Sequence, residues 1–176
     1  MLLFAACAGV VALFLAWGLS RWKGWFGPLV GCGFVWWLVV IGLVTMVPLA
    51  GIDLAVPEDA AQQTCSTDYG GPAPDGFWIF DGGQRLLNTV LFVPAGLLWV
   101  LLVSRWRAGL VLVPVGLVLL VGYSVGIEFA QLELSRISRA CDVTDMVDNS
   151  LGALIGTGIG ILALPVFRPW RHRTSR

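Results

Sequence analysis

The sequence predicts an all-α integral membrane protein, a bundle of five transmembrane helices with the N-terminus outside and the C-terminus inside. Hydrophobic residues make up 57% of the 176 residues, charged residues only 12%, and the mean hydropathy is +0.84. A soluble domain of this size would expose enough apolar surface to aggregate. Apolar runs of about twenty residues recur along the chain, and each can cross a hydrocarbon core as a helix.

The first expected span, 2–20, is followed rather than preceded by basic residues, Arg21 and Lys23. A signal peptide has its basic residues before the apolar run, so we expect a retained helix. The chain divides into this helix with an inner loop at 1–27, a larger transmembrane unit at 28–167, and a basic tail at 168–176. Within the larger unit, helices are expected at 28–50, 86–103, 108–132 and 146–167, with a long polar outer loop at 51–84.

Basic residues are distributed unevenly between the two sides of the predicted bundle. Eight of the eleven Lys and Arg residues fall after the first span, in the link at 104–107 and in the tail, whereas nearly all acids fall on the other side. The positive-inside rule therefore places the N-terminus outside and the C-terminus inside. The formal net charge is zero, so bulk charge gives no reason to expect a nucleic-acid partner.

The four cysteines fall into two groups. Cys7 and Cys32 lie inside spans and are interpreted as small apolar packing residues. Cys65 and Cys141 fall in outer segments, where the compartment permits a disulfide between the long loop and the link before the last span. The alternative is two free thiols on one side. No Cys-x-x-Cys motif or Cys/His cluster occurs, so we expect no metal site and no cofactor.

Polar residues converge near the outer ends of the last three spans. Asn88 lies about one turn below the outer end of its span, Glu128 and Gln131 lie in the last turns of theirs, and Asp145 and Asn149 lie in the first turns of the last. An ionisable residue inside a span is a functional candidate by default. A structural ion-pair network that joins the helices explains the same positions equally well.

The last span carries a ridge of small residues, Gly152-x-x-x-Gly156-x-x-x-Gly160. Such a ridge lets a neighbouring helix approach closely, and we expect it to serve packing rather than chemistry. Asp145 and Asn149 share this face by their spacing, so they are expected to face the bundle interior. A homo-oligomer packed through these glycines would supply symmetry that the single chain lacks.

The polar positions also resemble a known family. The pattern is Asn88-x-x-x-Phe92-x-Pro94-x-Gly96, then Glu128-x-x-Gln131, then Arg139-x-x-Asp142-x-x-Asp145-x-x-x-Asn149-x-x-Gly152-x-x-x-Gly156. It is similar to the VanZ-like family over about residues 28–165, small multi-span envelope proteins named for a member linked to teicoplanin resistance. Arg136 and Arg139 are alternatives for the family's arginine, and Arg139 fits the offsets to the aspartates better. The resemblance implies a multi-pass protein of the bacterial plasma membrane and implies no particular reaction.

Three functions are compatible with this cluster. The first is the binding or handling of an envelope lipid, such as a lipid-linked cell-wall precursor, at the outer leaflet. In that case Arg139 or Arg136 would pair with phosphate, and the amides of Gln131, Asn149 and Asn88 would bind sugar or peptide groups. A role in teicoplanin-type antibiotic resistance would follow from the resemblance.

The second function is an intramembrane enzyme acting on an envelope lipid, with Glu128 or Asp145 as general base. A divalent ion held by Asp142, Asp145 and Asp148 would assist it. The third is a non-enzymatic accessory protein whose polar cluster only joins helices. The only histidine, His172, lies in the basic tail. No Ser/His pair therefore supports catalysis, and we favour a protein without enzymatic activity.

Overall fold

The computed structural model describes residues 2–46, 63–68, 83–133 and 141–167. These residues contain five helices and no strand, and every helix is long and apolar enough to cross a membrane. The helices are α1 (Leu2–Lys23), α2 (Phe26–Met46), α3 (Gly83–Val103), α4 (Gly109–Glu133) and α5 (Val143–Phe167). The predicted all-helical membrane bundle is therefore confirmed.

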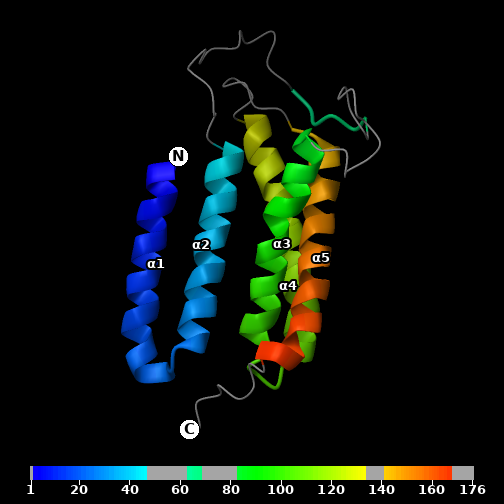
Figure 1. Cartoon of the computed structure of the whole chain (residues 1–176). Coiled ribbons are helices and arrows are strands. Elements are labelled where there is room, and N and C mark those ends of the chain that lie inside the picture. Colours follow the sequence, from blue (N-terminus) through cyan, green and yellow to red (C-terminus); the bar gives the residue numbers. More distant parts are fainter. Residues whose placement is uncertain (1, 47–62, 69–82, 134–140, 168–176) are drawn as a thin grey trace.

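Helices α1 and α2 form an antiparallel hairpin beside the other three helices (Figure 1). Only Gly24 and Trp25 separate them, and Gly24 takes a φ of 73°, a left-handed conformation that glycine adopts without a steric penalty. We call the end of the bundle with this turn the hairpin end. The opposite end, where α3 and α5 begin and α4 ends, is the loop end.

The closest helix pair is α3 with α5, and the glycine ridge lies between them. A Cβ atom on Gly152 would clash with the backbone oxygen of Thr89, and one on Gly156 would clash with that of Val93. Gly160 in turn faces the side chain of Val100. The ridge therefore packs against α3 within one chain, and the expected homo-oligomer stays a prediction.

The apolar core joins α2, α3, α4 and α5. Its buried members are Ile41, Phe92, Ala95, Leu120, Ile127 and Ala153. Helix α1, by contrast, leaves large apolar side chains such as Phe4 and Leu13 exposed, as is typical of a face that meets lipid. This apolar cluster therefore joins the helices that also hold the polar cluster, and a second buried group, Phe26, Val30 and Leu101, lies at the hairpin end.

Aromatic side chains connect the helices by donating hydrogen bonds to backbone oxygens of their neighbours. These bonds are Trp36 Nε1 to Ala5 O at 2.9 Å, Trp37 Nε1 to Leu91 O at 2.8 Å, Trp99 Nε1 to Leu112 O at 2.9 Å, and Tyr123 Oη to Leu38 O at 2.9 Å. Each bond satisfies a polar group that would otherwise be costly within a membrane. Together they connect α1 to α2, and α2, α3 and α4 to one another.

Candidate functional site

A buried ion pair links α3 to α5 at the loop end. Arg85 Nε donates to Asp148 Oδ2 and Arg85 Nη2 donates to Asp148 Oδ1, both at 2.8 Å. Asp148 is fully buried and Arg85 is 7% exposed. This two-bond geometry is the strongest form of an arginine–carboxylate contact. The ion pair thus fixes the first turns of α3 and α5 relative to each other.

Arg85 was not among the expected site residues, and Asp148 was named only as one of three aspartates that could hold a divalent ion. Asp148 precedes Gly152 by four residues, so it lies in register with the glycine ridge that packs against α3. Arg85 likewise precedes buried Thr89 by four residues and buried Phe92 by seven. This spacing was the sequence signal for the pair. Asp145, one turn earlier, is partly exposed.

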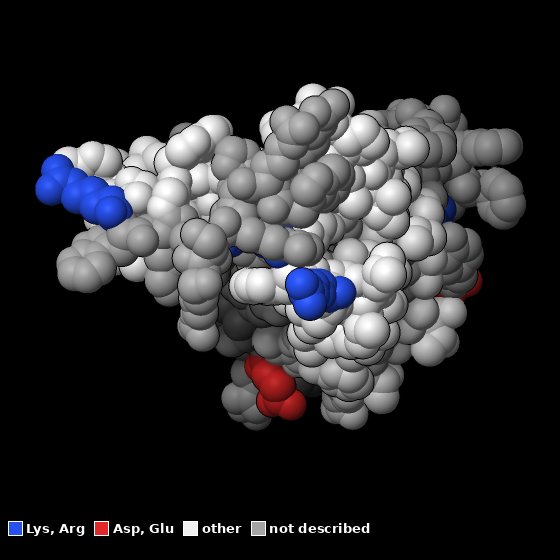
Figure 2. Space-filling view, turned by 90° about the horizontal axis from the view of Figure 1, so that it is seen from below, with Lys and Arg blue, Asp and Glu red and all other residues white. Residues whose placement is uncertain are grey.

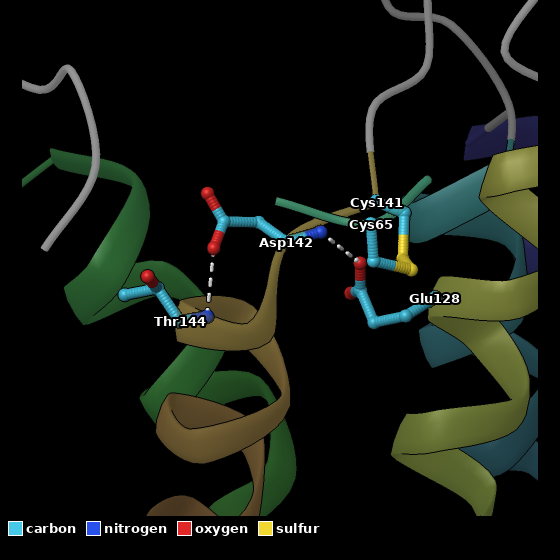
Figure 3. The surroundings of a disulfide bond; sticks show 5 residues. All are labelled: Cys65, Glu128, Cys141, Asp142 and Thr144. Carbon is cyan, nitrogen blue, oxygen red and sulfur yellow. Dashed lines mark hydrogen bonds between the residues drawn. A yellow bond between two sulfur atoms is a disulfide. The ribbon is translucent and has the colours of Figure 1, made fainter. Parts of the chain in front are cut away.

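Glu128 and Asp142 hold the start of α5 against the end of α4. The backbone N–H of Asp142 donates to Glu128 Oε2 at 3.0 Å, and the backbone N–H of Thr144 donates to Asp142 Oδ1 at 2.7 Å (Figure 3). Asp142 is therefore the N-cap of α5, which satisfies an N–H of the first turn. Glu128 is only 2% exposed, so its carboxylate depends on this backbone partner.

A disulfide between Cys65 and Cys141 lies beside Glu128 (Figure 3). Their Cα atoms are 4.7 Å apart, within the usual range for a disulfide. Two backbone hydrogen bonds extend this link: the Ser66 N–H donates to Cys141 O and the Val143 N–H donates to Ser66 O, each at 3.0 Å. The segment 63–68 is thus fastened to the start of α5.

Two buried amides from α4 and α5 reach other helices. Asn149 Nδ2 donates to Ser124 Oγ of α4 at 3.0 Å, and Gln131 Nε2 donates to Thr45 O of α2 at 2.9 Å. Asn149 is 2% and Gln131 is 7% exposed. Both side chains therefore face the interior of the bundle, as the spacing predicted for Asn149.

Asp145 and Asn88 lie nearer the surface of the cluster. Gln84 Nε2 of α3 donates to Asp145 Oδ2 at 3.1 Å. Asn88 lies close enough to interact with the same carboxylate, although its Nδ2 is not in hydrogen-bond geometry. This side of the cluster joins α3 to the first turn of α5.

Three buried amide atoms have no hydrogen-bond partner among the residues that the structure describes. They are Asn88 Nδ2, Gln131 Oε1 and Asn149 Oδ1. They come from α3, α4 and α5, one from each, and all belong to the loop end. Unsatisfied buried polar atoms are rare in proteins and call for an explanation. Together they amount to one donor and two acceptors.

Four carboxylates lie close enough to interact electrostatically, namely Glu128, Asp142, Asp145 and Asp148. Asp148 is held by Arg85, while the other three accept the bonds described above. In the described part of the chain, no three His, Cys, Asp or Glu residues are placed to hold a metal ion. The arrangement of the three aspartates therefore gives no support to a shared divalent ion.

Of the expected site residues, the structure brings together Asn88, Glu128, Asp142 and Asp145. Asn149 and Gln131 lie at the same end of the bundle and bond to Ser124 and Thr45. Arg136 and Arg139 lie outside the described residues, so the expected phosphate contact stays a prediction. The assembled groups are amides, carboxylates and one buried guanidinium. Such a set hydrogen-bonds sugars, peptides and other neutral polar groups.

Fold and site together define a multi-pass membrane protein with a polar cluster between three helices at one end of the bundle. A family model described as VanZ/LLP1 matches residues 3–164, and the chain belongs to this family. The match begins near the start of α1, so it includes a helix that the resemblance by motif had left out. No curated protein and no solved structure shows a significant match.

Proposed function

We propose that this VanZ-like membrane protein binds the polar head of a lipid-linked envelope component, such as a cell-wall precursor, at the loop end. The observation that carries the proposal is the set of buried amide atoms Asn88 Nδ2, Gln131 Oε1 and Asn149 Oδ1. A head group with both donors and acceptors satisfies them, whereas an apolar lipid tail does not.

The surrounding groups suit such a head group. Sugar hydroxyls and peptide N–H groups donate to amide oxygens and carboxylates, and Asp145 is the less buried of the two acids that α5 contributes to the cluster. Phosphate would pair with Arg136 or Arg139, which follow α4 in the sequence directly. The Arg85–Asp148 pair orients α3 against α5 and so positions the amides.

The proposal places the loop end at the outer leaflet of a bacterial plasma membrane, with the N-terminus outside. Two features support this orientation. The basic residues concentrate on the hairpin end and in the tail, as the positive-inside rule requires. The Cys65–Cys141 disulfide lies at the loop end, and disulfides persist in oxidising compartments. Binding of a cell-wall precursor at this site would link the protein to teicoplanin-type resistance.

The direct test is lipid binding by an Asn88→Leu variant. The full chain is purified in nanodiscs, and co-purification of a radiolabelled lipid-linked peptidoglycan precursor is measured. Leucine has a similar volume and removes the amide, so we expect binding to fall about tenfold or more, the loss of one to two good hydrogen bonds. The melting temperature should stay the same or rise, because a buried unsatisfied donor is removed.

The matched control is Ser150→Ala, because the Ser150 hydroxyl donates to Met146 O within α5 at 2.6 Å and does not reach the cluster. This variant should bind the precursor as the unmodified protein does. Normal precursor binding by Asn88→Leu would refute the proposal and favour a purely structural cluster.

A further inference from the structure

A cavity of about 900 Å³ lies at the hairpin end, far from the polar cluster along the helices. It is bounded by the end of α1, by the first half of α2, and by the end of α3 with the segment that follows it. Its lining includes Leu19, Gly27, Gly31, Leu102, Arg105 and Trp106. One charged group and one interfacial tryptophan therefore lie in an otherwise apolar wall.

Arg105 is held against the first turn of α2. A Cβ atom on Gly27 would clash with the guanidinium, so only glycine lets the arginine lie there. The guanidinium carbon is 5.9 Å from the centre of the Trp106 ring, whose side chain is 49% exposed. Arginine and tryptophan together are typical of the depth at which lipid head groups lie.

An apolar groove of about 420 Å³ lies between α1 and α2, next to the cavity. Gly31, Cys32 and Val35 line both spaces, so they are adjacent. The remaining lining of the groove is apolar and includes Val11, Leu15 and Val39. A charged recess next to an apolar groove matches an amphiphile with a head and a chain.

The charge at this end has a single sign. Arg21 and Arg107 are exposed here. Figure 2 shows basic side chains near the middle and at the edge of this face, and acidic side chains only toward the margins of the view. The sequence has no Asp or Glu in 1–52, 82–127 or 149–176, the segments that include the hairpin ends of all five helices. Basic recesses between transmembrane helices on one face select anionic lipid head groups.

We propose that the hairpin end holds a specific site for an anionic phospholipid. The lipid phosphate contacts the Arg105 guanidinium beside Trp106. One acyl chain lies in the α1–α2 groove, along Gly31 and Val35. This site is separate from the proposed precursor site, because the two occupy opposite ends of the bundle. It does not depend on that function.

The head-group test compares Arg105→Gln with Arg107→Gln, because both remove one positive charge from the same end. Native mass spectrometry of the purified full chain measures binding of phosphatidylglycerol and phosphatidylcholine. We expect the unmodified protein to prefer phosphatidylglycerol, and Arg105→Gln to lose about five- to tenfold in affinity for it. Arg107→Gln should change it by less than about twofold, since an exposed charge is solvated.

Arg105→Lys tests whether the loss comes from the missing charge, because lysine keeps the positive charge. This variant should keep the preference for phosphatidylglycerol. Equal binding of both lipids by the unmodified protein would overturn the proposal. So would normal phosphatidylglycerol binding by Arg105→Gln.

The acyl-chain test compares two glycines of α2. A Cβ atom on Gly31 would contact only the Leu102 side chain, at 3.5 Å, and Gly31 lies in the wall that cavity and groove share, whereas Gly33 borders neither space. Gly31→Leu should weaken phosphatidylglycerol binding several-fold and Gly33→Leu should not. Millimolar inorganic phosphate should fail to displace the lipid; its displacement would show a free-anion site instead and refute the lipid proposal.

Discussion

The side chains that matter most to this molecule are the charged ones that it buries. Removing two charges from water costs several kcal/mol per ion, and only close pairing offsets this cost. Arg85 and Asp148 achieve such pairing with two bonds of 2.8 Å. Glu128 is stabilised differently, by a backbone N–H at the cap of α5. Buried charge at the loop end is thus organised by specific partners.

Asp148→Asn should destabilise the protein strongly, because it leaves the Arg85 guanidinium buried without its counter-charge. Breaking one side of a buried pair costs about 3–5 kcal/mol. Thermal unfolding of the purified chain in detergent measures the effect. Replacing both partners by apolar residues, Arg85→Met with Asp148→Leu, should restore much of the loss. An Asp148→Asn variant as stable as the unmodified protein would show that the ion pair contributes little to the stability of the fold.

At the scale of helices, the contact between α3 and α5 positions the site. Small residues on both sides allow it, since a Cβ atom on Gly96 of α3 would clash with the backbone oxygen of Ala153 of α5. Close approach of two backbones increases van der Waals contact, which drives association where no water is available to be released. Both helices carry residues of the polar cluster one to three turns away from this contact.

Gly156→Leu should force α3 and α5 apart, because its side chain would occupy the position of the Val93 backbone. Overpacking a tight contact costs about 1–3 kcal/mol or more. Gly158→Leu is the matched control on the same helix, since no atom lies within 4 Å of a Cβ atom there. The melting temperature should fall only for the first variant. Equal melting temperatures would show that the two helices separate without cost.

The spacing of residues predicted much of these helices but not their partners. Hydropathy alone located all five helices, because a run of about twenty apolar residues has few alternatives to a membrane span. With Asp142 as its cap, α5 starts three residues earlier than expected, and this cap is a local signal that the sequence carries. The glycine ridge was visible too. Its partner was not, because spacing describes a face and cannot distinguish α3 from a second copy.

For the whole molecule, topology predicted the depth of the site. Asn88, Gln131 and Asn149 come from separate helices, and in the sequence only the alternation of membrane crossings indicates that they share one end. The pairing of Arg85 with Asp148 was missed because both residues lie at helix starts, where charges also occur for solvation and for the helix dipole. Which carboxylate meets which donor depends on helix rotation, and hydropathy does not define rotation.

The orientation of the whole molecule gives a further prediction. A green fluorescent protein fused after Arg176 should fluoresce, and alkaline phosphatase fused at the same point should be inactive, because the basic tail is expected in the cytoplasm. A phosphatase fusion at Glu133, after α4, should be active. The opposite pattern would invert the bundle and would move the proposed precursor site to the inner leaflet.

The disulfide also has a consequence for how the protein is made. Cys65 and Cys141 are 76 residues apart, and α3 and α4 lie between them. During synthesis the bond can close only after both helices have crossed the membrane and returned the chain to the side that Cys65 occupies. A chain in which α4 fails to insert would keep Cys65 and Cys141 on opposite sides, as thiols. The presence of the disulfide therefore indicates that α3 and α4 have both been inserted into the membrane.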